Sequence, residues 1–415
     1  MHIAFFNRSF YPDIAATGQL LTELCEDLVQ VYGCRVSVVA GVPLSSASHS
    51  FTHTQPGWLF DREHYRGVDI LRARGTRFPK QHVLGRGCNY LSYFLSACYA
   101  GLRLQPPDVI VALTDPPIIG LAAYLASRRF GAPLIISYRD IFPEAAWILE
   151  DFQSPVVNHA LQRINCFLVQ KSSRLIALGD TMRQRLIEGK GADPAKTVVI
   201  PDWADCEAIA PSPKRNAFAL EHDLADAFVI MHAGNIGLSQ GLETLIEAAV
   251  HLQVWPDIRI VLVGDGVKKP ALQEQVRHLG LSNVRFIPFQ PKESLRHSYA
   301  SADVFVISLK QGLAGYIVPS KLYSILAAGR PYVAAVEPDC EVTAITQQYG
   351  CGLCIEPGHA QGLAEAILRL YHNRTLAQRL GQNARRAALA FDRRRHVRAY
   401  YDLFQTDIEE PRLAA

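Results

Sequence analysis

The residues around position 320 have the types and spacing best suited to chemistry. Pro319, Ser320 and Lys321 precede an apolar run that ends at Gly329 and Pro331. Proline in the first turn and glycine after the last turn are typical of the two ends of a helix. The pattern predicts a short helix whose N-terminus carries free N–H groups, a hydroxyl and an ammonium. Such a helix start favours an anion, and a diphosphate is the anion that we expect here.

A glycine-rich loop precedes this helix in the same half of the chain. Gly234 and Gly237 follow an apolar run at 228–233, and Asn235 and Gln240 supply hydrogen-bonding groups without charge. Glycines between a strand and a helix let the backbone approach a phosphate closely. We therefore predict a second part of the diphosphate site in this loop.

The next loop has the same form but a weaker signal. Gly264 and Gly266 flank Asp265, and Lys268 and Lys269 follow them. The lysines either reach a phosphate or begin a solvated helix, and both interpretations stay open.

The first half of the chain offers a glycine and three carboxylates after apolar runs. Gly18 follows the first run and leads into a helical pattern, which suits a diphosphate, an acceptor hydroxyl or a plain connection. Asp115, Asp140 and Glu144 follow later runs. Each either binds or polarises an acceptor or caps its own loop. The nicotinamide fingerprint G-x-G-x-x-G is absent after the first run, which disfavours a dehydrogenase.

Strand-like apolar runs alternate with helical patterns along the whole chain. The runs are 2–7, 35–41, 108–113, 133–138, 174–178, 197–201, 228–233, 259–263, 284–289, 303–307, 332–336 and 352–355. Continuous apolar strands indicate a parallel sheet covered on both faces. We predict an α/β fold with two doubly wound, Rossmann-like domains facing a cleft. The domains are expected at 1–207 and 208–382, with a linker at 211–216 and helices at about 383–410 bracing the first domain.

Composition restricts the class of protein further. The chain has 415 residues, 49% hydrophobic and 20% charged, with a net charge of +3. These values are ordinary for a globular protein and do not imply nucleic acid. The nine cysteines are scattered apart from Cys351 and Cys354, which lack a second pair at zinc spacing. With no signal-peptide pattern and no run of about 20 apolar residues, we expect a cytoplasmic protein.

A basic stretch precedes an apolar, aromatic helical pattern at 90–95. Its members are Arg72, Arg74, Arg77, Lys80 and Arg86. Basic residues beside such a helix can dock on anionic lipid at the inner face of the cytoplasmic membrane. The alternative, a core helix after a solvated basic loop, is slightly favoured.

Taken in order, these motifs resemble family 4 of the retaining glycosyltransferases, which have the two-domain fold called GT-B. The matching pieces are Tyr11 and Pro12 with Gly18, then 114–117, 140–144, 200–205, 234–241, 263–266 and 319–331. The likeness covers nearly the whole chain and is greatest to the bacterial O-antigen, capsule and exopolysaccharide branch.

The resemblance implies transfer of a hexose or N-acetylhexosamine from a UDP- or GDP-sugar. The acceptor would be a glycan or a polyprenyl-diphosphate-linked molecule, and no metal or cofactor would be needed. Attack on the face that the leaving group departs from would retain the anomeric configuration, with the leaving phosphate accepting the proton.

This sequence departs from the family pattern at both of its usual charged positions. The family's paired glutamates, which touch the donor sugar and the ribose, correspond to Tyr316 and Ser324. The usual Arg and Lys of the glycine loop correspond to Asn235 and Gln240. We predict that Lys321, with Lys268 or Lys269 and the helix N-termini, replaces these charges.

Two other functions remain as alternatives. The same fold serves nucleotide-sugar epimerases, although that chemistry needs carboxylates and a histidine around the sugar. A non-catalytic nucleotide-sugar-binding subunit would explain the missing glutamates.

Overall fold

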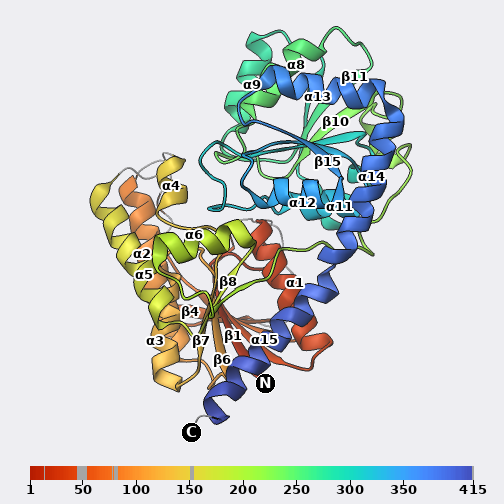
Figure 1. Ribbon diagram of the computed structural model, residues 1–415. Helices are drawn as coiled ribbons and strands as arrows, with labels where there is room; N and C mark the ends of the chain where they lie inside the picture. The colour runs from red at the N-terminus through yellow and green to blue at the C-terminus, as the bar shows by residue number, and fades with distance from the viewer. Residues whose placement is uncertain (14, 44–53, 77, 79–82, 150–153, 414–415) are drawn as a thin grey trace. The chain divides into compact units, whose positions relative to one another are not determined.

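The computed structural model describes residues 1–13, 15–43, 54–76, 78, 83–149 and 154–413. The chain divides into two compact units. Unit 1 consists of Met1–Pro201 and Val397–Ala415, and unit 2 of Asp202–His396. Each unit has its own sheet (Figure 1).

Unit 1 contains a nine-stranded sheet in the order β3-β4-β5-β2-β1-β6-β7-β8-β9. The strands are β1 (His2–Phe6), β2 (Arg35–Gly41), β3 (Thr54–Gln55), β4 (Phe60–Tyr65), β5 (Val68–Ala73), β6 (Val109–Ala112), β7 (Leu134–Ser137), β8 (Arg174–Ala177) and β9 (Thr197–Val199). All pairings from β5 to β9 are parallel, whereas β3 and β4 form an antiparallel edge. The parallel strands β1, β2, β6 and β7 are buried almost throughout, as continuous apolar runs predict.

Helices cover both faces of this sheet (Figure 1). They are α1 (Ala16–Gln30), α2 (Val83–Leu102), α3 (Ile119–Phe130), α4 (Glu144–Ile148), α5 (Pro155–Lys171), α6 (Asp180–Lys190) and most of α15 (Arg393–Leu413). The last helix packs on the first strand, where Phe404 meets Phe5 edge to face with ring centroids 6.1 Å apart. The end of the chain therefore completes the core of the unit in which the chain begins.

Unit 2 contains a six-stranded, fully parallel sheet in the order β12-β11-β10-β13-β14-β15. The strands are β10 (Phe228–Ala233), β11 (Ile258–Val263), β12 (Val284–Ile287), β13 (Val304–Ser308), β14 (Tyr332–Ala335) and β15 (Gly352–Ile355). Numbered along the chain, this order is 3-2-1-4-5-6, the order of a dinucleotide-binding sheet.

The helices of unit 2 also lie on both faces. They are α7 (Ala217–Glu221), α8 (Glu243–Leu252), α9 (Lys269–His278), α10 (Leu295–Ala300), α11 (Lys321–Ala327), α12 (Glu341–Tyr349), α13 (Ala360–His372) and α14 (Arg374–Ala388), with 3-10 turns η1 (Lys292–Ser294) and η2 (Leu389–Phe391). In Figure 1, α8, α9 and α13 lie on one face and α11 and α12 on the other. Leu245, Ile246 and Ile367 pack against Ile230 and Ile260 in the core of the first face.

Every strand expected from the sequence is present, with ends within about two residues. The expected fold, two doubly wound α/β units, is confirmed. The strands β3, β4 and β5 were not expected. The β4 sequence is FDREHY, whose charges give no apolar run because this strand is only half-buried at the edge of the sheet.

Two details of the predicted organisation differ from the structure. Residues 211–216, expected to link domains, lie inside unit 2, where Lys214 pairs with Asp303 and Asn216 caps α7. The second detail is the boundary: the chain passes between units at Pro201 and again at His396, so residues 383–396, expected to brace the first domain, belong to unit 2. Beside these passages, the Ala204 amide donates to the Phe391 carbonyl at 3.1 Å, so the two segments are hydrogen-bonded within unit 2.

Candidate active site

In unit 2, the loops after β10 and β13 meet where the strand order reverses. The Lys310 amide donates to the Ser239 carbonyl at 2.8 Å, and the Ser308 hydroxyl donates to the Gln240 carbonyl. In parallel α/β sheets, ligands bind outside the carboxyl ends of the strands at this reversal. The glycine-rich loop therefore lies where the fold favours a ligand.

The loop after β10 is also joined to the loop after β11. The Ile236 amide donates to the Asp265 carbonyl at 2.8 Å, and the Lys268 amide donates to the Ile236 carbonyl at 3.0 Å. A Cβ on Gly264, which has φ +145°, would lie 1.9 Å from the Gly234 carbonyl oxygen. Gly264 is required by this close approach of two backbones, which is a structural reason for the glycine independent of any phosphate.

The polar side chains of Gln240, Asp265 and Asn235, predicted to bind the donor, are used inside the loops themselves. The Gln240 Oε1 accepts from the Gly237 amide at 2.9 Å, and the Asp265 Oδ1 accepts from the Gly266 amide at 2.8 Å. The amide group of Asn235 lies beside Gly237, where a Cβ would approach its Nδ2 to 2.5 Å. These residues shape the turn.

The two lysines that follow the second glycine loop are bound nearby. Lys268 Nζ donates to Glu243 Oε1 at 2.8 Å, and Lys269 Nζ donates to the Gly264 carbonyl at 3.2 Å. Partial burial by itself raises the pKa of Glu243. Its hydrogen bonds and the charge of Lys268 together outweigh that effect, so the pKa is lowered. Both lysines follow the predicted loop, but their amino groups are bound by acceptors of unit 2, Glu243 and the Gly264 carbonyl.

Lys321 is different because its amino group points to the glycine turn. A Cβ built on Gly234, which has φ +124°, would lie 3.9 Å from Lys321 Nζ. The same Nζ lies 3.2 Å from Nε2 of His232, a residue of β10 with no exposed surface. Burial lowers the pKa of Lys321 to about 7. Within the described part of the chain, Lys321 has no carboxylate partner.

The residues around Lys321 adopt the predicted turn and helix only in part. α11 has seven residues, Ser320 is its N-cap without a side-chain capping bond, and the Leu322 amide donates to the Pro319 carbonyl at 3.2 Å. Gly329 ends the helix with φ +65°, as predicted. With so short a helix, the ammonium of Lys321 supplies more positive potential than the helix dipole.

The positions of the family's glutamates are half-buried. Ser324 hydrogen-bonds to Tyr299, whose pKa burial raises to about 12 against the effect of that hydrogen bond. The amide of Tyr316 donates to the Leu313 carbonyl at 3.0 Å. Neither side chain supplies a carboxylate.

In unit 1 the strand order reverses between β1 and β6, as it does between β10 and β13 in unit 2. The loops that meet at this reversal contain an ion pair. Arg8 Nε lies 3.2 Å from Asp115 Oδ1, and the Ser9 hydroxyl donates to Asp115 Oδ2 at 2.7 Å. Gly18 lies in the first turn of α1, where a Cβ would be 3.3 Å from the carbonyl carbon of Ser9. The glycine thus lets the helix pack on its own loop.

Asp140 and Glu144 follow β7 in this unit but have different surroundings. The Asp140 amide donates to the Thr114 hydroxyl at 3.3 Å, which places it beside the loop of Asp115. Both carboxylate oxygens of Glu144 accept from Lys190 Nζ at 2.8 Å. Lys190 is 3% exposed, and burial lowers its pKa while Glu144 raises it. Glu144 is therefore the counter-ion of a buried lysine.

The predicted basic stretch is only partly described, and one of its members was misplaced. Arg77, Lys80 and the side chain of Arg86 lie outside the described residues. Arg72 belongs to β5, is 1% exposed and pairs with Glu63 at 2.7 Å. Its placement in a solvated, lipid-facing loop was therefore wrong, because the charged edge strand that carries its partner was not recognised.

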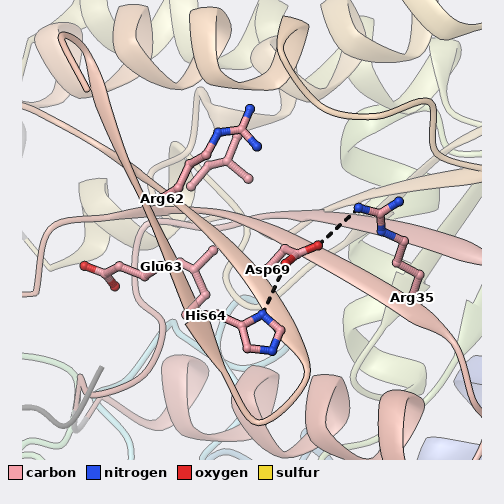
Figure 2. Close-up of a pocket in the computed structure, with 7 residues that line it drawn as sticks. Arg35, Arg62, Glu63, His64 and Asp69 are labelled. Atoms are coloured by element: carbon pink, nitrogen blue, oxygen red, sulfur yellow. Dashed lines mark hydrogen bonds and ion pairs between the residues drawn. The ribbon is translucent and has the colours of Figure 1, made fainter. Parts of the chain in front are cut away.

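Unit 1 also has an open pocket, whose lining includes Glu63 but none of the predicted site residues. Figure 2 shows it at the amino end of β2, lined by Arg35, Arg62, Glu63, His64, Asp69, Ile70 and Leu71. His64 Nδ1 and Arg35 each contact Asp69, at 3.2 and 3.4 Å. Exposed ion pairs of this kind contribute little to the free energy of unfolding. The amino end of a parallel sheet is also opposite to the edge where ligands bind.

No three His, Cys, Asp or Glu side chains among the described residues gather as a metal ion requires. None of the described helices has the length and apolar character needed to cross a bilayer.

Solved structures with the same architecture are numerous. A sucrose-phosphate synthase from Thermosynechococcus elongatus superposes with a TM-score of 0.77 at 16% identity, covering 98% of each chain. WaaG, a glycosyltransferase involved in lipopolysaccharide biosynthesis, gives a TM-score of 0.72 at 16% identity, covering 97% of this chain and 99% of WaaG. The fold with two doubly wound sheets is that of the GT-B glycosyltransferases.

Sequence comparisons identify the family. The model for glycosyl transferase 4-like domains matches residues 17–203, and that for glycosyl transferases group 1 matches residues 216–387. The probable glycosyltransferase WbjE of Pseudomonas aeruginosa is 28% identical over 72% of this chain and 75% of its own length. The putative colanic acid biosynthesis glycosyl transferase WcaI of Escherichia coli K12 is 25% identical over 90% and 94%. The chain belongs to family 4 of the glycosyltransferases.

One residue of the site was overlooked in the sequence. His232 stands in the otherwise apolar run of β10, and no role was predicted for it. A histidine one residue before the end of a buried strand, just before a glycine turn, was the available signal. The structure adds that this ring contacts Lys321.

Proposed function

We propose that this glycosyltransferase moves a hexose or N-acetylhexosamine from a UDP- or GDP-sugar to a glycan or polyprenyl-diphosphate-linked acceptor, with retention of configuration and without a divalent ion. The pathway would be the assembly of a bacterial surface polysaccharide. The observation that carries the proposal is Lys321, a cation without a carboxylate partner in the described chain that points to the Gly234 turn.

Unit 2 would hold the donor diphosphate. When the sugar leaves, negative charge increases on the β-phosphate, and a fixed cation stabilises that charge more than it stabilises the bound donor. Lys321 would supply the cation. The Ser320 hydroxyl, which makes no capping bond, and the backbone of residues 234–237 would supply hydrogen bonds. Lys268 and Lys269 would stabilise the loops instead of contacting the donor.

Unit 1 would bind the acceptor. Asp115 and Asp140 lie on adjacent loops joined through Thr114, and Arg8 holds Asp115. A carboxylate there can orient or polarise an acceptor hydroxyl. We assign that role to Asp140 first, because both carboxylate oxygens of Asp115 are engaged, one by Arg8 and the other by the Ser9 hydroxyl. Glu144 is assigned to stability, since both its oxygens bind Lys190.

The relatives support the classes of substrate. The HepE protein of Anabaena, similar in fold at a TM-score of 0.73, was solved in complex with UDP-glucose. A relative from Mycobacterium tuberculosis, 24% identical over 94% of this chain and 92% of its own length, is named a GDP-mannose-dependent alpha-mannosyltransferase. WcaI supports a role in polysaccharide synthesis by its name. Together they favour a nucleoside-diphosphate sugar and leave both bases to be tested.

A peripheral membrane position would suit a lipid-linked acceptor. Leu91, Leu95 and Leu102 of α2 are exposed at a spacing that puts them on one side of the helix. Flotation with liposomes that contain or lack anionic lipid tests this position. Leu91→Ser with Leu95→Ser should reduce flotation, whereas equal recovery of both proteins would reject it.

The function is tested by incubating the protein with UDP- and GDP-sugars and separating the products. Transfer or slow release of free sugar is expected, whereas an epimer or binding alone would support the two alternative functions. Lys321→Ala should lose donor binding by about 100-fold, the value of a strong charge-assisted contact. Asp140→Ala should keep donor binding and lose transfer. If Lys321→Ala keeps both, the diphosphate assignment is wrong.

A further inference from the structure

We propose that His232 is a positioning residue for the donor diphosphate: it accepts a hydrogen bond from Lys321 and thereby holds the ammonium at the Gly234 turn. This inference rests on the proposed function of Lys321. It adds a residue for which the motifs of the sequence give no role.

The placement of the two residues supports this role. His232 lies on β10, one residue before the strand ends, and Lys321 is the first residue of α11. The ring is fully buried, and its Nε2 is the hydrogen-bond partner of Lys321 Nζ at 3.2 Å. A lysine side chain has four rotatable bonds, so a fixed partner reduces the entropy lost when the ammonium binds an anion.

The ring can accept this hydrogen bond because it is neutral. Burial lowers the pKa of His232 well below its ordinary value, and the neighbouring Lys321 lowers it further, whereas the carbonyls of Asn235 and Val306 raise it. A neutral ring has one bare nitrogen. With Lys321 as an ammonium, that nitrogen is Nε2, and the proton lies on Nδ1, a buried atom without a hydrogen-bond partner among the described residues.

Nε2 also lies 3.3 Å from the carbonyl oxygen of Asn235. A protonated Nε2 would donate to that carbonyl, whereas a bare Nε2 accepts from Lys321. The ammonium form of Lys321 therefore selects one tautomer of the ring. A diphosphate at the turn stabilises the ammonium, so donor binding strengthens the pair.

Other charged groups on the surrounding segments are engaged elsewhere. Glu337 accepts from the amides of Gly312 and Ala314, and Arg385 of α14 donates to the carbonyls of Ala327, Ile209 and Cys206. Lys310 is exposed and acts on Glu243, which pairs with Lys268. Among the described residues, His232 is the titratable group whose side chain lies within hydrogen-bonding distance of the Lys321 ammonium.

A double-mutant cycle tests the proposal by calorimetric titration with UDP-glucose and with GDP-mannose. His232→Leu should weaken donor binding by about tenfold, the value of one lost hydrogen bond to a charged group. In the Lys321→Ala background the same change should not alter donor binding, because the ammonium that His232 positions is absent. His232→Gln, which can place an amide near Nε2, should bind within about threefold of wild type, showing rescue by a polar group.

The cycle distinguishes this inference from the function on which it rests. If His232→Leu weakens binding equally in both backgrounds, or not at all, His232 does not act through Lys321 and the proposal falls. If Lys321→Ala alone leaves binding unchanged, the diphosphate assignment falls instead. Thermal unfolding of His232→Leu and His232→Gln controls for the fold, since a buried substitution that only destabilises would lower Tm without the dependence on Lys321.

Discussion

The two units place opposite chemistry at the same point of the same topology. In each, the loop after the first strand meets the loop after the neighbouring strand across the reversal of strand order, which is β6 in unit 1 and β13 in unit 2. Unit 1 has an ion pair there, between Arg8 and Asp115 at 3.2 Å. Unit 2 has Lys321 beside a glycine turn, with a neutral histidine as its neighbour. The first arrangement neutralises its own charge and suits an uncharged hydroxyl, whereas the second leaves a positive charge for an anion.

This comparison also explains the glycines. In unit 2, glycine lets two loop backbones touch, as at Gly264. In unit 1, Gly18 lets a helix touch its own loop. Neither glycine needs a ligand to explain it, because each permits a close backbone approach. The phosphate site proposed for unit 2 would then be a consequence of this packing, which leaves Lys321 nearby.

The largest effect should come from breaking the packing in unit 2. Gly264→Ala puts a Cβ 1.9 Å from the Gly234 carbonyl oxygen, so the turn beside Lys321 must move. We expect donor affinity to fall by about 100-fold, since a misplaced binding group loses most of its contribution. Titration of UDP- or GDP-sugar measures it. Gly280→Ala is the control: its φ is +63°, but nothing lies within 4 Å of the added Cβ. Equal losses in both variants would contradict the explanation.

A smaller effect, on a different parameter, should follow from altering unit 1. Asp140→Asn should lower the transfer rate by about 10- to 100-fold, at or below the lower end of the roughly 100- to 10,000-fold range of general acid–base groups, because asparagine keeps an oxygen that can orient a hydroxyl. The donor dissociation constant should stay within about twofold, because the diphosphate contacts lie in unit 2. Comparing transfer rate with donor titration checks both. A matching loss of donor affinity would remove the division of roles between the units.

The pH dependence of donor binding sharpens the comparison. The amino group of Lys321 has a pKa lowered to about 7 by burial, and the diphosphate requires its charged form. Donor affinity should be constant from about pH 6 to 7 and should fall by up to about tenfold per pH unit above 7, because binding then takes up a proton. The diphosphate of a nucleotide sugar does not titrate in this range. Lys321→Arg should give a flat profile, since arginine stays charged. A wild-type profile that is also flat would contradict the assignment.

The smallest effect on catalysis is expected at Glu144. Glu144→Gln leaves Lys190, which is 3% exposed, without its carboxylate partner. The free energy of unfolding should fall by about 1–3 kcal/mol, less than for a fully buried pair because Glu144 is partly exposed. The transfer rate of the folded protein should stay within about twofold. Urea unfolding measures the first, and an assay at saturating substrate the second. Lys190→Met with Glu144→Gln should recover part of the stability, and a large loss of rate would restore Glu144 as a catalytic candidate.

The sequence by itself determined the architecture. Buried parallel strands must be apolar on both faces, and that requirement made runs such as 228–233 and 332–336 recognisable without a structure. It also determined the family, because the motifs from Tyr11 to Pro331 are short local patterns that can be recognised, in order, from the sequence alone. The edge strand β4 could not be found in this way, since its outward face needs no apolar residues.

Only the tertiary structure decided which polar residues are available for chemistry. Lys268, Lys269 and Lys321 were all candidates for the diphosphate in the sequence, yet the first two bind acceptors of their own unit and the third points to the Gly234 turn. Arg72 and Glu144 look like surface charges, yet each belongs to a pair with a buried member. Local sequence sets propensities and turns, whereas the partner of a charge depends on a strand or helix far away in the chain, as with His232 and Lys321.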